Sequence, residues 1–270
     1  MAKSTYYVEI GKIDAVKRRN QALADRIQAV FIHHKQCYGV RRVHQELVRL
    51  GYMVNHKRVQ RLIHQLRLSG IRPGITYRSY KGAVGKTAAN IIDRNFKATA
   101  PLQKWMTDVS QFTFSWGKYY LSPILDMYTN EIISFDLSLH PTLQQIERML
   151  HAAFTAFPKV TGLILHSDQG WQYQHLYFRE TLRKHGMIQS MSRKGNCYDN
   201  SIMESYFGRM KTEMYYGYED TYPSFESFSA AVAEYIQYYN TERIQQKNKM
   251  DATSNIPVSI HLNHLIQLFL

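Results

Sequence analysis

Three acidic residues in separate apolar or helical segments constrain the fold of this chain more than any other feature. The apolar run 163–165 leads directly to Asp168, and the segment 105–109 carries Asp108 in a similar strand-like setting. Glu204 follows Asp168 after thirty-five intervening residues and lies near the start of a segment with helical periodicity. Because open α/β sheets place functional side chains at the carboxyl ends of strands, the spacing predicts a sheet on which the three carboxylates converge.

The charge of the chain is concentrated in its first hundred residues. Residues 1–100 hold 20 Lys and Arg against 5 Asp and Glu, whereas residues 101–270 hold 14 against 16. The net charge of +13 therefore hides a segment of +15 followed by one of −2. A positive charge confined to one segment is typical of a module that binds a polyanion, most commonly nucleic acid. A generally basic solvated surface would spread the charge along the chain.

The cysteine content and the hydropathy of the chain indicate its compartment. Cys37 and Cys197 lie far apart in sequence, which argues against a disulfide scaffold and favours a reducing cytoplasm. No signal peptide or membrane span is indicated, because residues 1–10 lack an apolar core and no stretch is long and apolar enough. With 270 residues, 44% of them hydrophobic, the chain is long enough for two globular domains. We therefore expect a soluble, cytoplasmic protein without membrane partners.

The basic first part of the chain predicts a small all-α domain. Apolar residues recur at helical spacing from Gln21, and two further helices are predicted over 40–50 and 56–69, the second capped by Asn55. The predicted buried side chains of these two helices are Val43, Leu47, Leu50, Val59, Leu62, Ile63 and Leu66. Two short helices joined by a tight turn, the second of them basic, predict a helix-turn-helix that places one helix in a DNA groove. The alternative is a small bundle whose charges are only solvated.

The candidate DNA-binding residues of this domain lie on its last two predicted helices: Arg41, Arg42, Lys57, Arg58 and Arg61. We assign residues 1–72 to the helix-turn-helix domain. Residues 73–100 contain scattered Gly, several Lys and Arg and no sustained period, which predicts a basic linker.

From Pro101 the sequence alternates between strand and helix patterns. Strands are predicted over 104–114, 118–126, 131–139, the stretch that ends near Asp168 and the stretch around Ile188. Helices are predicted over 142–157 and 173–185, from about 201 onward, and over 225–239. Three antiparallel strands followed by helix-connected strands predict an α/β domain with a mixed sheet flanked by helices, the ribonuclease-H-like arrangement, over residues 101–246.

Two residues near the candidate site have simpler structural interpretations. Asp126 also lies on a predicted strand, but it precedes a turn, which favours a turn-capping role. Ser201 and Glu204 have the spacing of a capping box, in which the glutamate would only bond the helix N-terminus. The predicted buried stripe of that helix is Met203, Phe207, Met210 and Met214. Because this stripe leaves Glu204, Gly208 and Lys211 together on an adjoining face, function is favoured for Glu204.

Carboxylates from three elements provide the hard oxygen ligands that suit Mg²⁺ or Mn²⁺. Two such ions can activate a nucleophile and stabilise the leaving oxygen of a phosphodiester. The adjacent His166, Ser167 and Asp168 instead suggest a Ser/His/Asp hydrolase, but neighbouring strand residues point to opposite faces and no G-x-S-x-G turn is present. The sequence therefore favours a site for two divalent ions.

Five stretches of the sequence resemble a known family. They are YGVRRV at 38–43, WMTD at 105–108, HSDQG at 166–170, the run 190–201 and ESYFGRMKTE at 204–213. Through them, about residues 20–246 are similar to the OrfB-type transposases of the third bacterial insertion-sequence family, relatives of retroviral integrases. The tail, residues 247–270, departs from the Leu/Lys-rich, Ser-Pro-containing tail that members of this family commonly have.

The resemblance implies that Asp108, Asp168 and Glu204 are the metal-binding DDE triad. Lys211 lies two helical turns after Glu204 on the same face, so we expect it to contact DNA near the metal, as the resemblance also implies. Arg193 and Lys194 are further candidate DNA-binding residues. The resemblance implies a DNA transposase, a polynucleotidyl transferase that cleaves the element's end to a 3′-hydroxyl and directs its attack on another phosphodiester. The partners implied are double-stranded DNA, as element ends and target, further copies of the chain, and an upstream-frame protein with another helix-turn-helix. Such a protein is expected at the bacterial nucleoid.

Two other functions are compatible with the sequence. A catalytically impaired relic or regulator of the same element would bind DNA without processing it, and the divergent tail favours this alternative while the intact triad opposes it. A nuclease of the same fold would only hydrolyse DNA.

Overall fold

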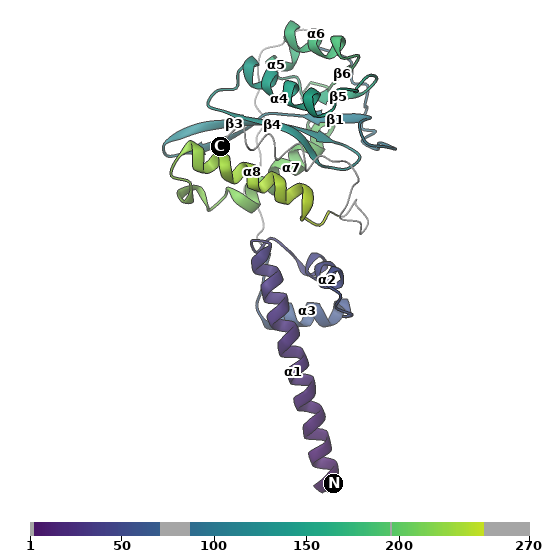
Figure 1. Cartoon of the computed structure of the whole chain (residues 1–270), viewed down its shortest axis with the longest axis vertical. Coiled ribbons are helices and arrows are strands. Elements are labelled where there is room, and N and C mark those ends of the chain that lie inside the picture. The colour runs from purple at the N-terminus through teal and green to yellow at the C-terminus, as the bar shows by residue number, and fades with distance from the viewer. Residues whose placement is uncertain (1–2, 71–86, 195, 246–270) are drawn as a thin grey trace. The chain divides into compact units, whose positions relative to one another are not determined.

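A computed structural model describes residues 3–70, 87–194 and 196–245 of the chain (Figure 1). The chain forms two compact units, Met1–Pro73 and Gly74–Leu270. Residues 73–86 of the predicted linker and the predicted tail 247–270 lie outside the described residues. Within the described residues, no helix combines the length and the apolar character needed to cross a bilayer.

The N-terminal unit consists of three helices, α1 (Lys3–His33), α2 (Val40–Arg49) and α3 (His56–Gln65). Asn55 caps α3 as predicted, because its side-chain oxygen accepts the backbone N–H of Lys57 at 2.8 Å. The side chains buried between the helices are Leu23, Ile27, Val30, Phe31, Val43, Leu47, Val59, Leu62 and Ile63. The short connection from α2 to α3 and this shared core match the predicted helix-turn-helix.

The helix boundaries of this unit differ from the predicted ones in three places. Helix α1 begins at Lys3 instead of Gln21; residues 16–19, just before the predicted start, are exposed and lack the apolar period that marks a buried helix. Leu50 is 41% exposed, since it lies beyond the last turn of α2. Helix α3 ends at Gln65 instead of Ser69, because Arg67 takes a positive φ of 53° that a helix cannot continue.

A six-stranded mixed sheet forms the centre of the second unit. Its strands are β1 (Lys104–Thr107), β2 (Ser110–Phe114), β3 (Gly117–Asp126), β4 (Ile132–Ser138), β5 (Ile164–Ser167) and β6 (Ile188–Met191). Strand β3 pairs antiparallel with β1, β2 and β4. Strand β5 pairs parallel with β1 on one side and with β6 on the other. The predicted mixed sheet is therefore confirmed.

The predicted single strand 104–114 is interrupted at Asp108 and Val109. Strands β1 and β2 lie on the same edge of β3 and keep one register, with Thr107 opposite Ile124 and Ser110 opposite Leu121. The interruption has a local cause: the Asp108 carboxylate accepts the N–H of Val109 at 2.8 Å, which withdraws that donor from the ladder.

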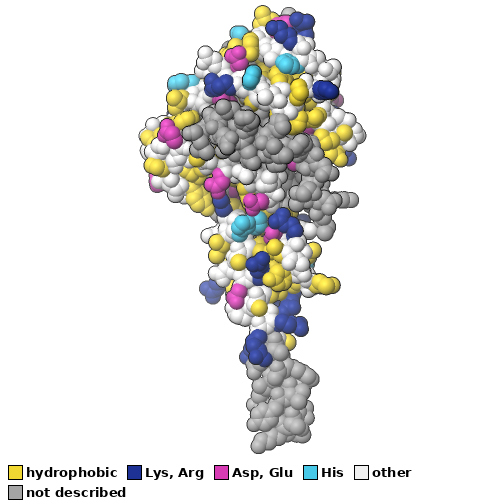
Figure 2. Space-filling model, viewed as in Figure 1, with side chains coloured by type: hydrophobic (Ala, Val, Ile, Leu, Met, Phe, Trp, Pro, Cys, Tyr) yellow, Lys and Arg dark blue, Asp and Glu magenta, His cyan; other side chains and the backbone are white. Residues whose placement is uncertain are grey.

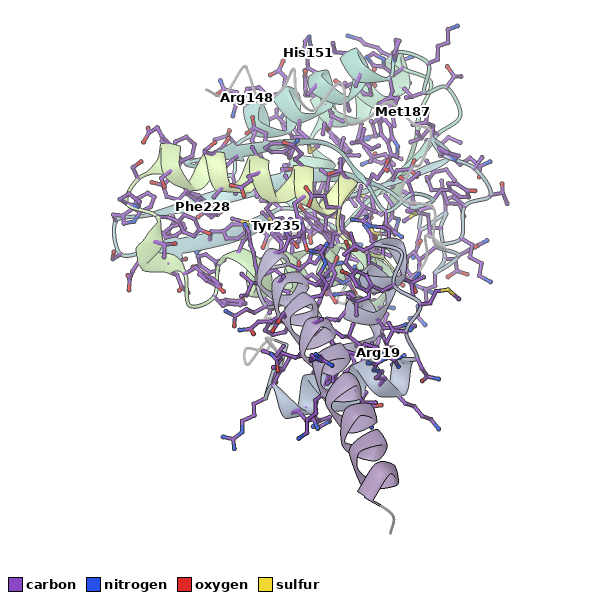
Figure 3. All side chains as sticks on the ribbon, turned by 60° about the horizontal axis from the view of Figure 1, so that its bottom comes forward. Arg19, Arg148, His151, Met187, Phe228 and Tyr235 are labelled. Atoms are coloured by element: carbon purple, nitrogen blue, oxygen red, sulfur yellow. The ribbon has the colours of Figure 1, made fainter. Side chains whose placement is uncertain are left out.

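Helices cover both faces of the sheet, as Figure 1 shows. Helices α4 (Leu143–Ala156), α5 (Trp171–Gln174) and α6 (Leu176–Lys184) lie on one side, and α7 (Ser201–Met214) and α8 (Phe225–Thr241) on the other. Short 3₁₀ turns, Cys197–Asn200 and Glu219–Thr221, precede α7 and α8. In Figure 3, Arg148 and His151 mark α4, whereas Phe228 and Tyr235 mark α8.

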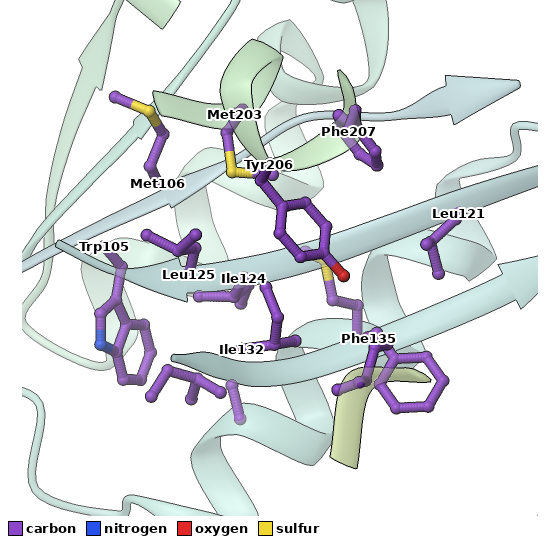
Figure 4. Packing of buried hydrophobic residues seen from close by; sticks show 14 of the residues in the cluster. Trp105, Met106, Leu121, Ile124, Leu125, Ile132, Phe135, Met203, Tyr206 and Phe207 are labelled. Carbon is purple, nitrogen blue, oxygen red and sulfur yellow. The ribbon is translucent and has the colours of Figure 1, made fainter. Parts of the chain in front are cut away.

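The packing of α7 on the sheet fixes the helix that carries Glu204. Met203, Tyr206 and Phe207 lie over the strand residues of the core in Figure 4, and each is less than 5% exposed. The predicted buried stripe of α7 is thus confirmed, with Tyr206 as an addition. At the far end of the helix, the buried Glu213 carboxylate accepts two guanidinium N–H bonds from Arg243, the shorter at 2.5 Å.

Residues 87–100, assigned from sequence to the linker, lie against this core. Ile92 is 2% exposed within the hydrophobic cluster. The backbone N–H groups of Ile91 and Ile92 both donate to Ser190 Oγ, at 3.0 and 3.4 Å. The packed part of the unit therefore begins before Pro101.

Asp126 has the turn-capping role predicted for it. Its Oδ1 accepts the N–H groups of Tyr128 and Thr129 at 2.8 and 3.0 Å, and its Oδ2 accepts those of Leu102 and the Trp105 indole at 2.8 and 3.2 Å. The side chain is completely buried. It therefore ties the turn after β3 to the chain that enters β1.

We predict that Asp126→Ala lowers the free energy of unfolding by about 2–4 kcal/mol, because several buried donors lose their acceptor. Urea denaturation of the full chain measures this change. The matched control is Asp220→Ala, at an exposed position, which should cost less than about 0.5 kcal/mol. Equal stabilities of the two variants would contradict the capping role.

Candidate active site

Asp108 and Asp168 are brought together by the pairing of β1 with β5. The parallel register sets Trp105 beside Leu165 and Met106 beside His166. Continued by two residues, the same register sets Asp108 beside Asp168, where both strands have just ended. Because neighbouring strands lie roughly 4.8 Å apart, the two carboxylates occupy adjacent positions at the carboxyl edge of the sheet.

The pKa of Asp108 reflects both the burial of its side chain and the nearby charges of Asp168 and Glu204. Burial raises the pKa of Asp108 well above its usual value, the negative charge of Asp168 raises it further, and the charge of Glu204 adds a smaller increase. Hydrogen bonds from Val109 and Asn200 lower the pKa in part. Burial also raises the pKa values of Asp168 and Glu204. The three predicted carboxylates therefore form one interacting group, with Asp108 at its most buried position.

Within the described part of the chain, no set of three or more His, Cys, Asp or Glu side chains is placed so that it could hold a metal ion. The chemistry of the donor set nevertheless fits one. A carboxylate whose pKa is raised by neighbouring acidic groups, as that of Asp108 is, favours a nearby cation, and hard oxygen atoms are the ligands of Mg²⁺ and Mn²⁺.

Glu204 lies in the first turn of α7 and is half-buried. The helix starts at Ser201, which is therefore its first residue and not its cap, so the capping-box interpretation is wrong. On the same helix, a Cβ built at Gly208 would meet no atom within 4 Å. The helix face that carries Glu204 is thus open enough for another molecule to approach.

Lys211 is neither a solvated lysine nor a free cation. Its Nζ donates to the backbone oxygen of Gln111 at 2.7 Å and lies 4.9 Å from the centre of the Phe112 ring. Burial lowers the pKa of Lys211 to about 8, while the charge of Asp108 opposes that change. The lysine therefore remains mainly protonated at neutral pH and lies within electrostatic range of the carboxylates.

His166 takes part in a buried hydrogen-bond chain beside the aspartates. Since the carbonyl of Asp199 can only accept, Nε2 of His166 carries the proton and donates to it at 3.1 Å. Nδ1 then accepts from Ser190 Oγ at 2.8 Å. Burial lowers the pKa of His166 to about 4, so the ring is neutral. Ser167 donates to the carbonyl of Asp168 instead of to a histidine, which argues against the Ser/His/Asp hydrolase.

Asp199 anchors the loop that precedes α7. Its carboxylate accepts hydrogen bonds from Asn90, Arg94 and Arg193, the last through both the backbone and the guanidinium. Arg193 also pairs with Asp93 at 3.0 Å. The loop before α7 is therefore held by polar contacts, and the predicted DNA-binding Arg193 is engaged within the protein. Lys194 is exposed.

Asn200 contacts the candidate site, and the sequence interpretation missed it. Its Nδ2 donates to Asp108 Oδ2 at 2.9 Å, and the residue is 6% exposed. An asparagine just before a helix is most simply interpreted as its cap. The sequence therefore gives no reason to expect the hydrogen bond to Asp108. The side chain makes no capping hydrogen bond to α7.

The predicted DNA-binding residues of the first unit fall into two groups. Arg41, Lys57 and Arg61 are exposed, and Figure 2 shows Lys and Arg side chains spread over the visible face of this unit. Arg58 instead donates to Asn20 Oδ1 at 2.8 and 3.1 Å, and Arg42 lies over the Tyr38 ring at 5.6 Å. The exposed three have side chains available for a phosphate backbone.

Comparison with known proteins finds matches in both parts of the chain. Residues 98–197 and 204–256 match two models of the integrase core domain, and residues 18–75 match a model of an HTH-like domain. InsK of insertion sequence element IS150 from Escherichia coli K12 is 42% identical over 247 residues, which cover 92% of this chain and 86% of that protein. The transposase for insertion sequence element IS904 from Lactococcus lactis is 36% identical over 231 residues, 83% of this chain and 88% of that protein.

Among solved structures, the HTLV-2 integrase catalytic core domain in complex with magnesium covers 57% of this chain and 97% of its own length, with 16% identity and a TM-score of 0.46. The class of protein therefore rests on the sequence matches, which define a DDE polynucleotidyl transferase with an integrase core domain. The chain belongs to the insertion-sequence transposases, and the predicted OrfB-type resemblance is confirmed.

We predict that Asp199→Asn loosens residues 87–96 and 193–200 together, because both segments bond to its carboxylate. Hydrogen exchange should accelerate in both segments and the melting temperature should fall. The hydrogen bonds of Arg193 hold the pKa of Asp199 well below its usual 3.8. The stability that this group supplies is therefore present above that pH and lost as the pH falls below it.

The control for this prediction is Asp93→Asn, because Asp93 pairs with the same arginine from an exposed position. It should leave both segments protected. If the amide hydrogens of both segments exchanged at the wild-type rate in the Asp199→Asn variant, the carboxylate would not anchor the loop.

Proposed function

We propose that this transposase cleaves the ends of its insertion element and joins them to target DNA at the carboxylate group formed by Asp108, Asp168 and Glu204. The observation that carries the proposal is the parallel pairing of β1 with β5, which sets Asp108 beside Asp168. The electrostatic effect of Glu204 on Asp108 supports a shared site. Relatives named as transposases support the reaction class.

The three carboxylates would hold one or two Mg²⁺ or Mn²⁺ ions. Bound there, such ions would supply Lewis acidity at the phosphodiester and favour deprotonation of a water or a 3′-hydroxyl. The residues of the chain would do the rest: the carboxylates would fix the ions, and the open face of α7 would admit the DNA backbone. Ions at this site would offset the charge of Asp168, which, after burial, is the next cause that raises the pKa of Asp108.

The proposed substrate is double-stranded DNA, as the ends of the element and as the target. The exposed Arg41, Lys57 and Arg61 would contact phosphates through the helix-turn-helix, and Lys194 and Lys211 would contact DNA near the carboxylates. Three further arginines would either support this binding surface through their present contacts within the protein or exchange those contacts for DNA: Arg42, Arg58 and Arg193. Joining two ends requires more than one copy of the chain, so we propose a homo-oligomer at the bacterial nucleoid, with an upstream-frame protein as a further partner.

We predict that Asp108→Asn, Asp168→Asn and Glu204→Gln each reduce Mg²⁺-dependent end cleavage and strand transfer by at least about a thousandfold, because each removes a charged ligand at nearly constant volume. Labelled element ends, assayed with and without target DNA, measure both steps. Affinity for the DNA should change little, since the basic residues remain.

Asp136→Asn is the matched control, because Asp136 is a buried carboxylate that pairs with Arg148 instead of with the triad. It should alter stability and keep activity. Full activity of any triad variant would remove that residue from the site, and cleavage without strand transfer by the wild-type protein would indicate a nuclease.

We predict that Lys211→Ala strongly weakens end processing, whereas Lys211→Arg retains it, because the role requires a cation near the carboxylates. Since the pKa of Lys211 is about 8, the wild-type ammonium loses its proton as the pH rises through that value. A guanidinium stays protonated. The ratio of the wild-type rate to the Lys211→Arg rate should therefore fall between about pH 7 and pH 9.

Lys184→Ala is the control for this series, because Lys184 is exposed at the end of α6. It should process ends at the wild-type rate. A ratio of wild-type to Lys211→Arg rates that does not change with pH would show that the charge of Lys211 has no part in the reaction.

A further inference from the structure

Asn200 combines three features that a capping residue does not show. It occupies the N-cap position of α7, yet its side chain makes no capping hydrogen bond. It is 6% exposed, and its Nδ2 donates to Asp108 Oδ2 at 2.9 Å. Its Oδ1 is buried without a hydrogen-bond partner. Since buried polar atoms are nearly always paired, an unpartnered oxygen at this place needs an explanation.

The amide group of Asn200 donates through Nδ2 to Asp108 Oδ2, so its oxygen faces away from that atom. This is the orientation that a metal-binding, ionised carboxylate requires, because it only accepts hydrogen bonds. Within one amide the nitrogen and the oxygen are about 2.3 Å apart, so Oδ1 lies at most about 5 Å from Asp108 Oδ2. An oxygen donor is thus available beside the carboxylate group.

The backbone around Asn200 is held in place by other contacts. The carbonyl of the preceding Asp199 accepts Nε2–H of His166, two residues before Asp168. The carboxylate of Asp199 is fixed by two arginines and Asn90. The position of the Asn200 side chain is therefore determined by the same network that borders Asp168, and not by the needs of α7.

We propose that Asn200 is a fourth residue of the divalent-metal site: its NH₂ group orients Asp108, and its amide oxygen is available to the ion or to a water bound to it. This inference rests on the proposed function, because it assumes the carboxylate metal site. An amide oxygen is a hard, neutral ligand of the kind that Mg²⁺ and Mn²⁺ accept. Polar groups that orient a ligating carboxylate also contribute to the affinity for the metal.

Binding of Mn²⁺ alone to the full-length protein tests the proposal without any DNA reaction. Titration calorimetry and the Mn²⁺-dependent shift in melting temperature give two independent readouts. Asn200→Ala should weaken Mn²⁺ binding on the order of tenfold. Asn200→Asp keeps an oxygen but adds a charge next to Asp108, so it should melt lower without metal, gain a larger Mn²⁺ shift than the wild type and bind Mn²⁺ at least as tightly.

Asn240→Ala is the matched control. Asn240 makes two hydrogen bonds to the backbone of Ile132, at 2.9 and 3.0 Å, so its loss should lower the melting temperature while Mn²⁺ affinity stays unchanged. The result that overturns the proposal is wild-type Mn²⁺ affinity in Asn200→Ala, or an Asn200→Asp variant that binds no better than Asn200→Ala.

The experiment also separates this proposal from the one on which it rests. If the wild type binds Mn²⁺ and Asp108→Asn does not, the carboxylate site stands, and the Asn200 variants decide the fourth residue. Equal Mn²⁺ affinity of the wild type and Asp108→Asn would remove the metal site itself, and the role of Asn200 with it.

Discussion

The parallel pairing of β1 with β5 is the constraint on which the rest of the site depends. Backbone hydrogen bonds hold residues 104–106 in parallel register with residues 164–166. As a result, β1 and β5 end side by side. The residue after each strand is an aspartate. Two carboxylates so placed repel each other: burial raises the pKa of Asp108 most, and the negative charge of Asp168 raises it further. The backbone thus imposes an arrangement that the side chains alone would not adopt.

Two polar networks keep this arrangement in place. On one side, His166, Ser190 and the carbonyl of Asp199 connect β5, β6 and the turn before α7. On the other, Glu213 and Arg243 connect the far end of α7 to the chain after α8. Because the apolar stripe of α7 also packs on the sheet, Glu204 projects from a helix that is fixed along its length. The active site is therefore supported by packing and hydrogen bonds outside the carboxylates themselves.

The sequence predicted the elements that have a strong period and missed those that depend on tertiary contacts. Strand-borne acids, the stripe of α7 and the cap at Asn55 follow from local patterns, and the structure contains them. The packing of Ile92 depends on tertiary contacts that no local pattern encodes. The interruption at Asp108 comes instead from a hydrogen bond to the neighbouring Val109, which a strand period does not reveal. Likewise, Arg193, Arg58 and Lys211 carry charges that favour DNA from sequence alone, but each has a partner inside the protein. Charge predicts the class of partner, whereas the tertiary structure decides which cations are available to it.

Asn200 shows why the chemistry of a site is harder to predict than its carboxylates. From sequence, an asparagine before a helix is a cap, and a glutamate four residues later belongs to the first turn. The tertiary structure turns the asparagine away from the helix and toward Asp108, ninety-two residues earlier in the chain. A cap that is not used and an oxygen that is not paired both weaken the protein as it stands. A cation bound beside Asn200, as proposed, would offset such local losses together with the repulsion between the carboxylates, because a ligand that binds only the folded state stabilises it.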